Sequence, residues 1–204
     1  MPKLLICLIC MTLLFCGCGR KKKVVVEEPA PKKVTTSSVV PETSEPASQG
    51  GDLKTVQELA GRSSVNPEEA VRVSNRLLQH ETASLLDEQT LNNLEKILLA
   101  ALPNSSQTTQ PVIQRNLGIV NYYNKKHNKA RQALQSANET NPRDARTHYY
   151  LACLFSHQAK ICTVKGDQTK AQRFQKRAQI EIETAQKLEP GNQLYRKGVS
   201  ALGE

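Results

Sequence analysis

The chain has 204 residues, of which 38% are hydrophobic, a composition typical of a soluble globular protein. It has five Tyr, three Phe and no Trp. Its apolar residues recur at helical intervals rather than in alternation, which argues against a β-sheet protein and predicts an all-α fold. The formal charge of +9 favours anionic partners, or serves solubility alone, and carries no information about the fold.

The N-terminal segment begins with one Lys and continues with twelve mainly apolar residues, 4–15. Twelve helical residues reach about 18 Å, less than the ~30 Å hydrocarbon core of a bilayer, so residues 1–17 are interpreted as a signal peptide. The end of this N-terminal segment, LLFCGC at residues 13–18, resembles a bacterial lipobox, in which a small residue precedes a lipidated Cys. The matching residue is Cys18, preceded by Gly17.

This resemblance implies an exported lipoprotein whose mature chain starts at Cys18 and is held on the membrane by acyl chains such as palmitate. Gly19, rather than Asp, follows that Cys. Under the enterobacterial sorting rule this favours the outer membrane of the cell envelope, with the domain facing the periplasm. The alternative is an uncleaved N-terminal anchor.

Residues 18–51 comprise the lipidated Cys and a segment rich in Pro, Ser, Thr, Lys and Glu without an aromatic residue. Such a segment cannot bury enough surface to offset its ordering entropy, so we predict a flexible tether. Residues 52–204 are predicted to form the helical domain. Asn66 before Pro67, and Asp87, are predicted N-caps of helices that extend to His80 and to Leu102.

Two similar segments follow, at about 111–144 and 145–191. Leu117 and Leu151 are 34 residues apart, the period of the tetratricopeptide repeat (TPR). In both segments an Ala (Ala130 or Ala178) is followed by an aliphatic residue at +4, a second Ala at +7 and a Pro at +12. These steps resemble the TPR pattern, which implies an α-solenoid of antiparallel helical hairpins.

The second segment is longer than the first by 14 residues between the matched Leu and Ala, divided as seven on each side of Gly166. Seven residues are close to two helical turns, so both helices can grow and keep their facing sides. The sequence therefore predicts one hairpin over 145–188 that projects by about two turns. A C-terminal capping helix is predicted after Gly191, with Leu194, Val199 and Leu202 as its apolar contacts.

Basic residues gather at the predicted tip of the long hairpin, with Asp167 as the single acid among them. They form either a contact for an anionic partner or an ordinary solvated face. The basic tip comprises Lys160, Lys165, Lys170, Arg173, Lys176 and Arg177.

The resemblance to TPR proteins also implies a concave face, lined by the first helix of each repeat, that binds a peptide or a partner helix. Some of its residues must instead serve packing between repeats. The outward-facing candidates for partner contact are Arg115, Ile119, Tyr122, Tyr123, Arg146, Tyr149 and Cys153.

No phosphate-binding loop, HExxH or nucleophile elbow occurs, and the four His show no metal-ligand spacing, so we expect neither an enzyme nor a cofactor. Cys153 and Cys162 are too far apart on one predicted helix to pair. Nucleic acid is not an expected partner, because the tip offers Phe174 alone for stacking.

Two functional hypotheses remain. In the first, the protein is a cell-envelope lipoprotein that acts as a scaffold or assembly factor by binding another protein or peptide. In the second, the basic tip binds anionic lipid or polysaccharide. The partner and the oligomeric state do not follow from the sequence.

Overall fold

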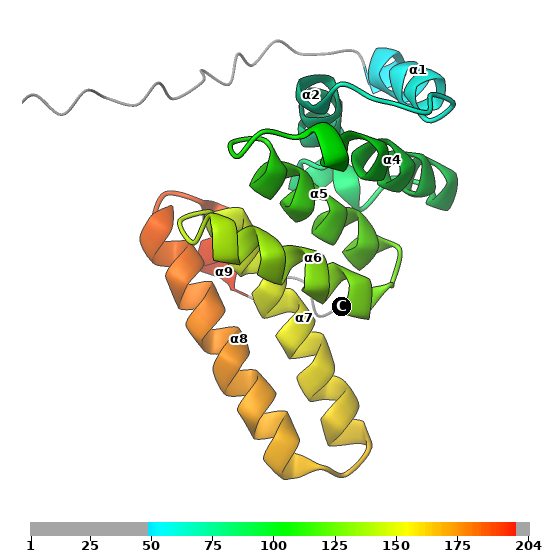
Figure 1. Cartoon of the computed structure of the whole chain (residues 1–204). Helices are drawn as coiled ribbons and strands as arrows, with labels where there is room; N and C mark the ends of the chain where they lie inside the picture. The colour runs from blue at the N-terminus through cyan, green and yellow to red at the C-terminus, as the bar shows by residue number, and fades with distance from the viewer. Residues whose placement is uncertain (1–48, 199–204) are drawn as a thin grey trace, which may run out of the picture. The chain divides into compact units, whose positions relative to one another are not determined.

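The computed structural model describes residues 49–198, which lie in the second of two compact units, residues 45–204. The predicted signal peptide, Cys18 and most of the predicted tether lie outside the described residues, as do Val199 and Leu202. Within the described range all regular structure is helical (Figure 1), which confirms the all-α prediction. The helices are α1 (Gln49–Leu59), α2 (Pro67–Leu77), α3 (His80–Ala83), α4 (Glu88–Ala101), the 3-10 helix η1 (Leu102–Asn104), α5 (Gln110–Tyr123), α6 (His127–Thr140), α7 (Ala145–Val164), α8 (Gln168–Leu188) and α9 (Gln193–Lys197).

The starts of α2 and α4 agree with the sequence prediction. The side chain of Asn66 accepts a hydrogen bond from the backbone N–H of Glu69 at 3.0 Å, and Pro67 occupies the first helical turn. Asp87 accepts in the same way from Thr90 at 2.6 Å. Each cap therefore satisfies an N–H that has no partner inside its own helix.

Two predicted boundaries are wrong. Helix α1 begins at Gln49, so the last three residues of the predicted tether are helical. The helix predicted from Pro67 to His80 ends at Leu77, and the short α3 follows after two residues. The break has a local cause, because the hydroxyl of Thr82 donates to the carbonyl oxygens of Leu77 and Gln79 and holds the chain in a turn.

Helices α5 and α6 pack against each other, and so do α7 and α8 (Figure 1). Helices α5 and α6 have 14 residues each, whereas α7 has 20 and α8 has 21. Only the residues Lys165–Asp167 connect the two long helices, so they run antiparallel. These bounds agree with the predicted long hairpin and its turn at Gly166.

The turns of the two hairpins share one backbone geometry. Lys125 and Gly166 each lie two residues after the end of a helix and have positive φ angles of 58° and 78°. In the following residues, the N–H of Lys126 donates to Asn121 and the N–H of Asp167 donates to Cys162, each across five residues. This pattern is a Schellman-type helix end in both hairpins.

The core is one cluster of buried side chains that extends from Val56 in α1 to Tyr195 in α9. Within it, Gly118 lets α5 approach α6 closely, because a Cβ at this position would lie 2.4 Å from Cγ of Leu134. Along the long hairpin, the rings of Phe155 and Phe174 stack with centroids 6.3 Å apart. Beyond these rings, toward the turn, the buried residues are the small Ala159, Cys162 and Ala171.

Candidate binding face

A polar network joins the helices α2, α5 and α7. Asn116 of α5 is fully buried and donates to the hydroxyl of Ser74 at 2.8 Å and to the side-chain oxygen of Asn75 at 2.9 Å. Arg115 donates to Asn75 at 2.8 Å and pairs with Asp144, the N-cap of α7, at 3.1 Å. Helices α2, α5 and α7 are therefore fixed to one another by directional hydrogen bonds as well as by apolar packing.

Arg146, the second residue of α7, lies beside this network. Its Nη2 is buried and has no hydrogen-bond partner among the described residues. Burial lowers the pKa of the Arg146 guanidinium, and the positive charge of Arg115 lowers that pKa further. The two arginines differ in their contact with Asp144, because Arg115 forms an ion pair with it, whereas the Arg146 guanidinium only feels its charge from farther away.

All five tyrosines of the chain lie in one aromatic cluster that continues the face from α5 through α7 to α9. Neighbouring rings have centroids 5.1–6.2 Å apart, and most pairs meet edge to face. The hydroxyls of Tyr123 and Tyr150 lie 3.2 Å apart. At the end of the cluster, Tyr195 of α9 packs on Tyr149. Burial raises the pKa of Tyr123 and Tyr150, so these hydroxyls stay protonated at neutral pH.

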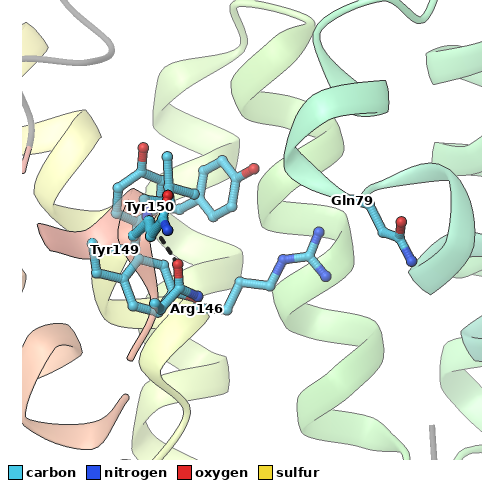
Figure 2. Close-up of a pocket in the computed structure, with 8 residues that line it drawn as sticks. Gln79, Arg146, Tyr149 and Tyr150 are labelled. Atoms are coloured by element: carbon cyan, nitrogen blue, oxygen red, sulfur yellow. Dashed lines mark hydrogen bonds between the residues drawn. The ribbon is translucent and has the colours of Figure 1, made fainter. Parts of the chain in front are cut away.

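A pocket of about 490 Å³ opens between α7, α9 and the α2–α3 turn. In Figure 2 the side chain of Arg146 extends from α7 toward Gln79 of that turn, with Tyr149 and Tyr150 beside it. The α9 side is formed by Asn192 and the residues after it. The pocket therefore combines aromatic walls, amide side chains and one guanidinium.

The structure brings most of the predicted partner residues into this region but changes the role of several. Ile119, Tyr149 and Cys153 are at most 3% exposed, so the prediction that they face outward is wrong. They lie in the interior because α7 packs against α5 and α9 covers Tyr149. The half-buried members of the predicted set are Arg115, Tyr122, Tyr123 and Arg146.

The residues of the basic tip do not form one group. Arg177 lies over the ring of Phe155, with its Cζ 4.3 Å from the ring centroid. It is therefore located at the stacked phenylalanines and not at the turn of the hairpin. Lys170 pairs with Asp167 at 2.9 Å. Lys160, Lys165, Arg173 and Lys176 are exposed, and Val164, the last residue of α7 and the neighbour of Lys165, is 88% exposed.

The sequence analysis did not predict the structural roles of several residues. Asn116 and Ser74 stand inside apolar helical stripes, and a polar residue in such a stripe signals a buried hydrogen bond. Tyr195 is the buried residue of α9, whereas the predicted contact Leu194 is only partly buried. His148 bridges Glu181 at 2.6 Å and the carbonyl of Pro142 at 3.0 Å.

No family model matches the chain, and no curated protein or solved structure shows detectable similarity to it. Within the described range, no three His, Cys, Asp or Glu side chains gather in a way that would hold a metal ion. None of the helices in residues 49–198 is both long and apolar enough to cross a bilayer. Cys153 and Cys162 are buried and free thiols.

Proposed function

We propose that this protein is a lipoprotein of the bacterial cell envelope that is anchored through Cys18 and binds another protein through TPR-like helical hairpins. It acts by binding rather than by catalysis, as a scaffold or assembly factor. The tether places the helical domain away from the membrane, and the face formed by α2, α5, α7 and α9 contacts the partner.

The observation that carries this proposal is the repetition of one hairpin. Lys125 and Gly166 occupy the same left-handed position in turns with the same hydrogen bonds, and the matched Leu117 and Leu151 are 34 residues apart. Repeated hairpins of this kind stack into an extended surface suited to peptides and partner helices. The paired amide, guanidinium and tyrosine groups on one side supply residue types common in protein interfaces.

Lipidation is tested by the intact mass of the protein purified from native membranes, beside a Cys18→Ala variant. We expect a chain that starts at Cys18 and carries acyl mass, with both features absent in the variant. An unmodified chain that retains Met1 would contradict the anchor and leave the binding face as the sole basis for function.

Partner binding is tested by site-specific photocrosslinking in intact cells. Gln79 and Gln193 are exposed at the pocket rim, so a photoreactive residue at either position should leave the core intact. Ile180, 53% exposed on α8 away from this pocket, is the matched control. We expect the same envelope protein to be captured from both rim positions and not from position 180, whereas equal capture from all three would exclude this face.

A second candidate function is binding to an anionic membrane surface through the hairpin tip. It is favoured by the exposed Val164 next to the exposed Lys165 at the end of α7, because an apolar side chain next to a basic group suits a lipid interface. Arg177 is not part of this surface, since it covers Phe155.

The tip is tested in a Cys18→Ala background, so that the lipid anchor cannot mask it. The triple change Lys165→Glu, Lys170→Glu and Arg173→Glu should abolish the salt-dependent part of binding to vesicles that contain anionic lipid. Val164→Ser should weaken binding at constant charge. Binding that is unchanged in both variants would eliminate this function.

A further inference from the structure

Two histidines meet where the hairpin of α5 and α6 packs against the hairpin of α7 and α8. His127 is the first residue of α6, and His157 lies in the second half of α7. Their half-buried rings are tilted by 40° and have centroids 4.2 Å apart, so the two imidazoles are in contact. The pair therefore forms part of the contact between α6 and α7.

Three features of His127 oppose a positive charge on its ring. Its Nδ1 is buried and has no hydrogen-bond partner among residues 49–198, so a proton at this atom would be an unsatisfied donor. Its place at the start of α6 is the positive end of the helix dipole. A proton on His157 adds a like charge in direct contact. In agreement, burial and then His157 lower the pKa of His127 below its ordinary value.

The other titratable groups next to the pair do not compensate its charge. The ring of Tyr122 in α5 lies 6.0 Å from that of His127, and burial raises the pKa of its hydroxyl, so it stays neutral. The basic residues close to either histidine in sequence, or on the α8 side of α7, are Lys126, Lys129, Lys160 and Arg177. Glu95 of α4 pairs with Lys126 and Lys129, and no carboxylate of residues 49–198 raises the pKa of His127.

Tyr122 connects the histidine pair to the aromatic cluster. Its ring meets His127 at 62° and Tyr150 of α7 at 68°, with centroids 6.0 Å and 5.6 Å away. It is also one of the half-buried residues of the candidate binding face. A displacement of the first turn of α6 therefore changes the packing around Tyr122.

We propose that the His127–His157 pair is a proton-sensitive contact between the two hairpins. With neutral rings, the imidazoles pack together and hold the first turn of α6 on α7. With both rings protonated, the like charges separate, and the first turn of α6 loosens together with Tyr122. The buried Leu134, two turns further along α6, keeps the rest of that helix packed. This property goes beyond the proposed function and requires neither the anchor nor a partner.

The direction of the pH effect follows from the lowered pKa of His127. The stabilisation by the neutral pair is fully present above the unfolded pKa of about 6.5 and is lost as pH falls through the lowered pKa of the folded state. Mild acid should therefore loosen this contact.

The charge coupling is tested by NMR on the full chain in detergent, with labelled histidine. We expect His157→Gln to raise the titration midpoint of His127, because it removes the neighbouring charge. His157→Glu should raise the midpoint further, and His157→Lys should lower it. His148→Gln is the matched control and should leave the midpoint unchanged, since His148 bonds to Glu181 instead.

The loosening is tested by hydrogen exchange at about pH 7.5 and about pH 5, on either side of the ordinary histidine pKa, with correction for the intrinsic exchange rates. The amide of Ala130 donates to Lys126 in the first turn of α6. We expect its protection to fall about threefold or more at the lower pH, whereas protection around the buried Leu94 of α4 stays the same. His127→Gln should abolish the change.

A His127 midpoint that none of the changes at position 157 moves would overturn the proposal. So would equal protection of Ala130 at both pH values, or an equal loss in His127→Gln. If His127→Gln fails to fold, His157→Gln takes its place, because it removes the same repulsion. Crosslinking from positions 79 and 193 at neutral pH tests partner binding separately, so either result can fail while the other stands.

Discussion

His148 illustrates how one residue makes stability depend on pH. Its two ring nitrogens face Glu181 and the carbonyl of Pro142, both acceptors, and only the protonated imidazolium can donate to both. The hydrogen bond to Glu181 is the main cause that raises the pKa of His148 above 6.5. The folded state thus binds this proton more tightly than the unfolded chain does.

The direction in which stability changes with pH follows from the linkage between protonation of His148 and folding. The stabilisation is fully present below the unfolded pKa of about 6.5 and is lost as pH rises through the raised pKa of the folded state. We expect the free energy of unfolding, measured with urea, to fall as pH rises above that value. His148→Gln should reduce this slope, and a slope unchanged in the variant would assign the effect to other groups.

Arg115 and Arg146 are expected to respond in opposite directions to removal of their charge. Arg115→Met removes the ion-pair partner of Asp144 and the donor to Oδ1 of Asn116, and should lower the free energy of unfolding by about 2 kcal/mol or more. Arg146→Met removes a half-buried charge whose partial desolvation lowers the pKa of the guanidinium, and should raise the free energy of unfolding by about 1 kcal/mol. Urea unfolding measures both, and Arg143→Met serves as the exposed control.

At the scale of helix pairs, Gly118 controls how closely α5 and α6 pack. A methyl group there would overlap the buried side chain of Leu134 and approach the carbonyl of Ala130. We expect Gly118→Ala to lower the free energy of unfolding by about 1–2 kcal/mol, because overpacking outweighs the gain in helix propensity. Gly191→Ala, where a Cβ would meet nothing within 4 Å, should have little effect and is the control.

The two hairpin turns permit a reciprocal exchange. Lys125 adopts a left-handed conformation that costs a residue with a Cβ about 1 kcal/mol, whereas Gly166 adopts it freely. We expect Lys125→Gly to raise the thermal midpoint slightly and Gly166→Ala to lower it, as measured by circular dichroism. Shifts of the same sign in both variants would contradict the equivalence of the turns.

For the helical unit as a whole, stability should be distributed unevenly. The core cluster is continuous from α1 to α9, but in the long hairpin only small side chains are buried beyond Phe155 and Phe174. We expect amide hydrogens around Cys162 and Ala171 to exchange faster than those around Leu151, since less apolar surface holds them. Hydrogen exchange followed by mass spectrometry measures this, and uniform protection along α7 would contradict it.

The local features of this protein were readable from its residues. Helical periodicity, the caps at Asn66 and Asp87, and the turn at Gly166 depend on chain neighbours a few residues apart, so the sequence alone determined them. The longer arms of the second hairpin were predictable for the same reason, because a spacing of seven residues preserves the side of a helix that faces its neighbour.

The tertiary structure decided which side chains are buried between helices and which distant residues become hydrogen-bond partners. Tyr149 and Ile119 were predicted to face a partner, yet both are buried. Helix α9 covers Tyr149, and α7 packs against the helix that carries Ile119. The network through Asn116 joins residues about forty positions apart, and no local pattern specifies such partners. Arg115 and Asp144, 29 residues apart, meet only because α5 packs against α7. The candidate site is therefore a product of packing between helices, whereas each helix is a product of its own sequence.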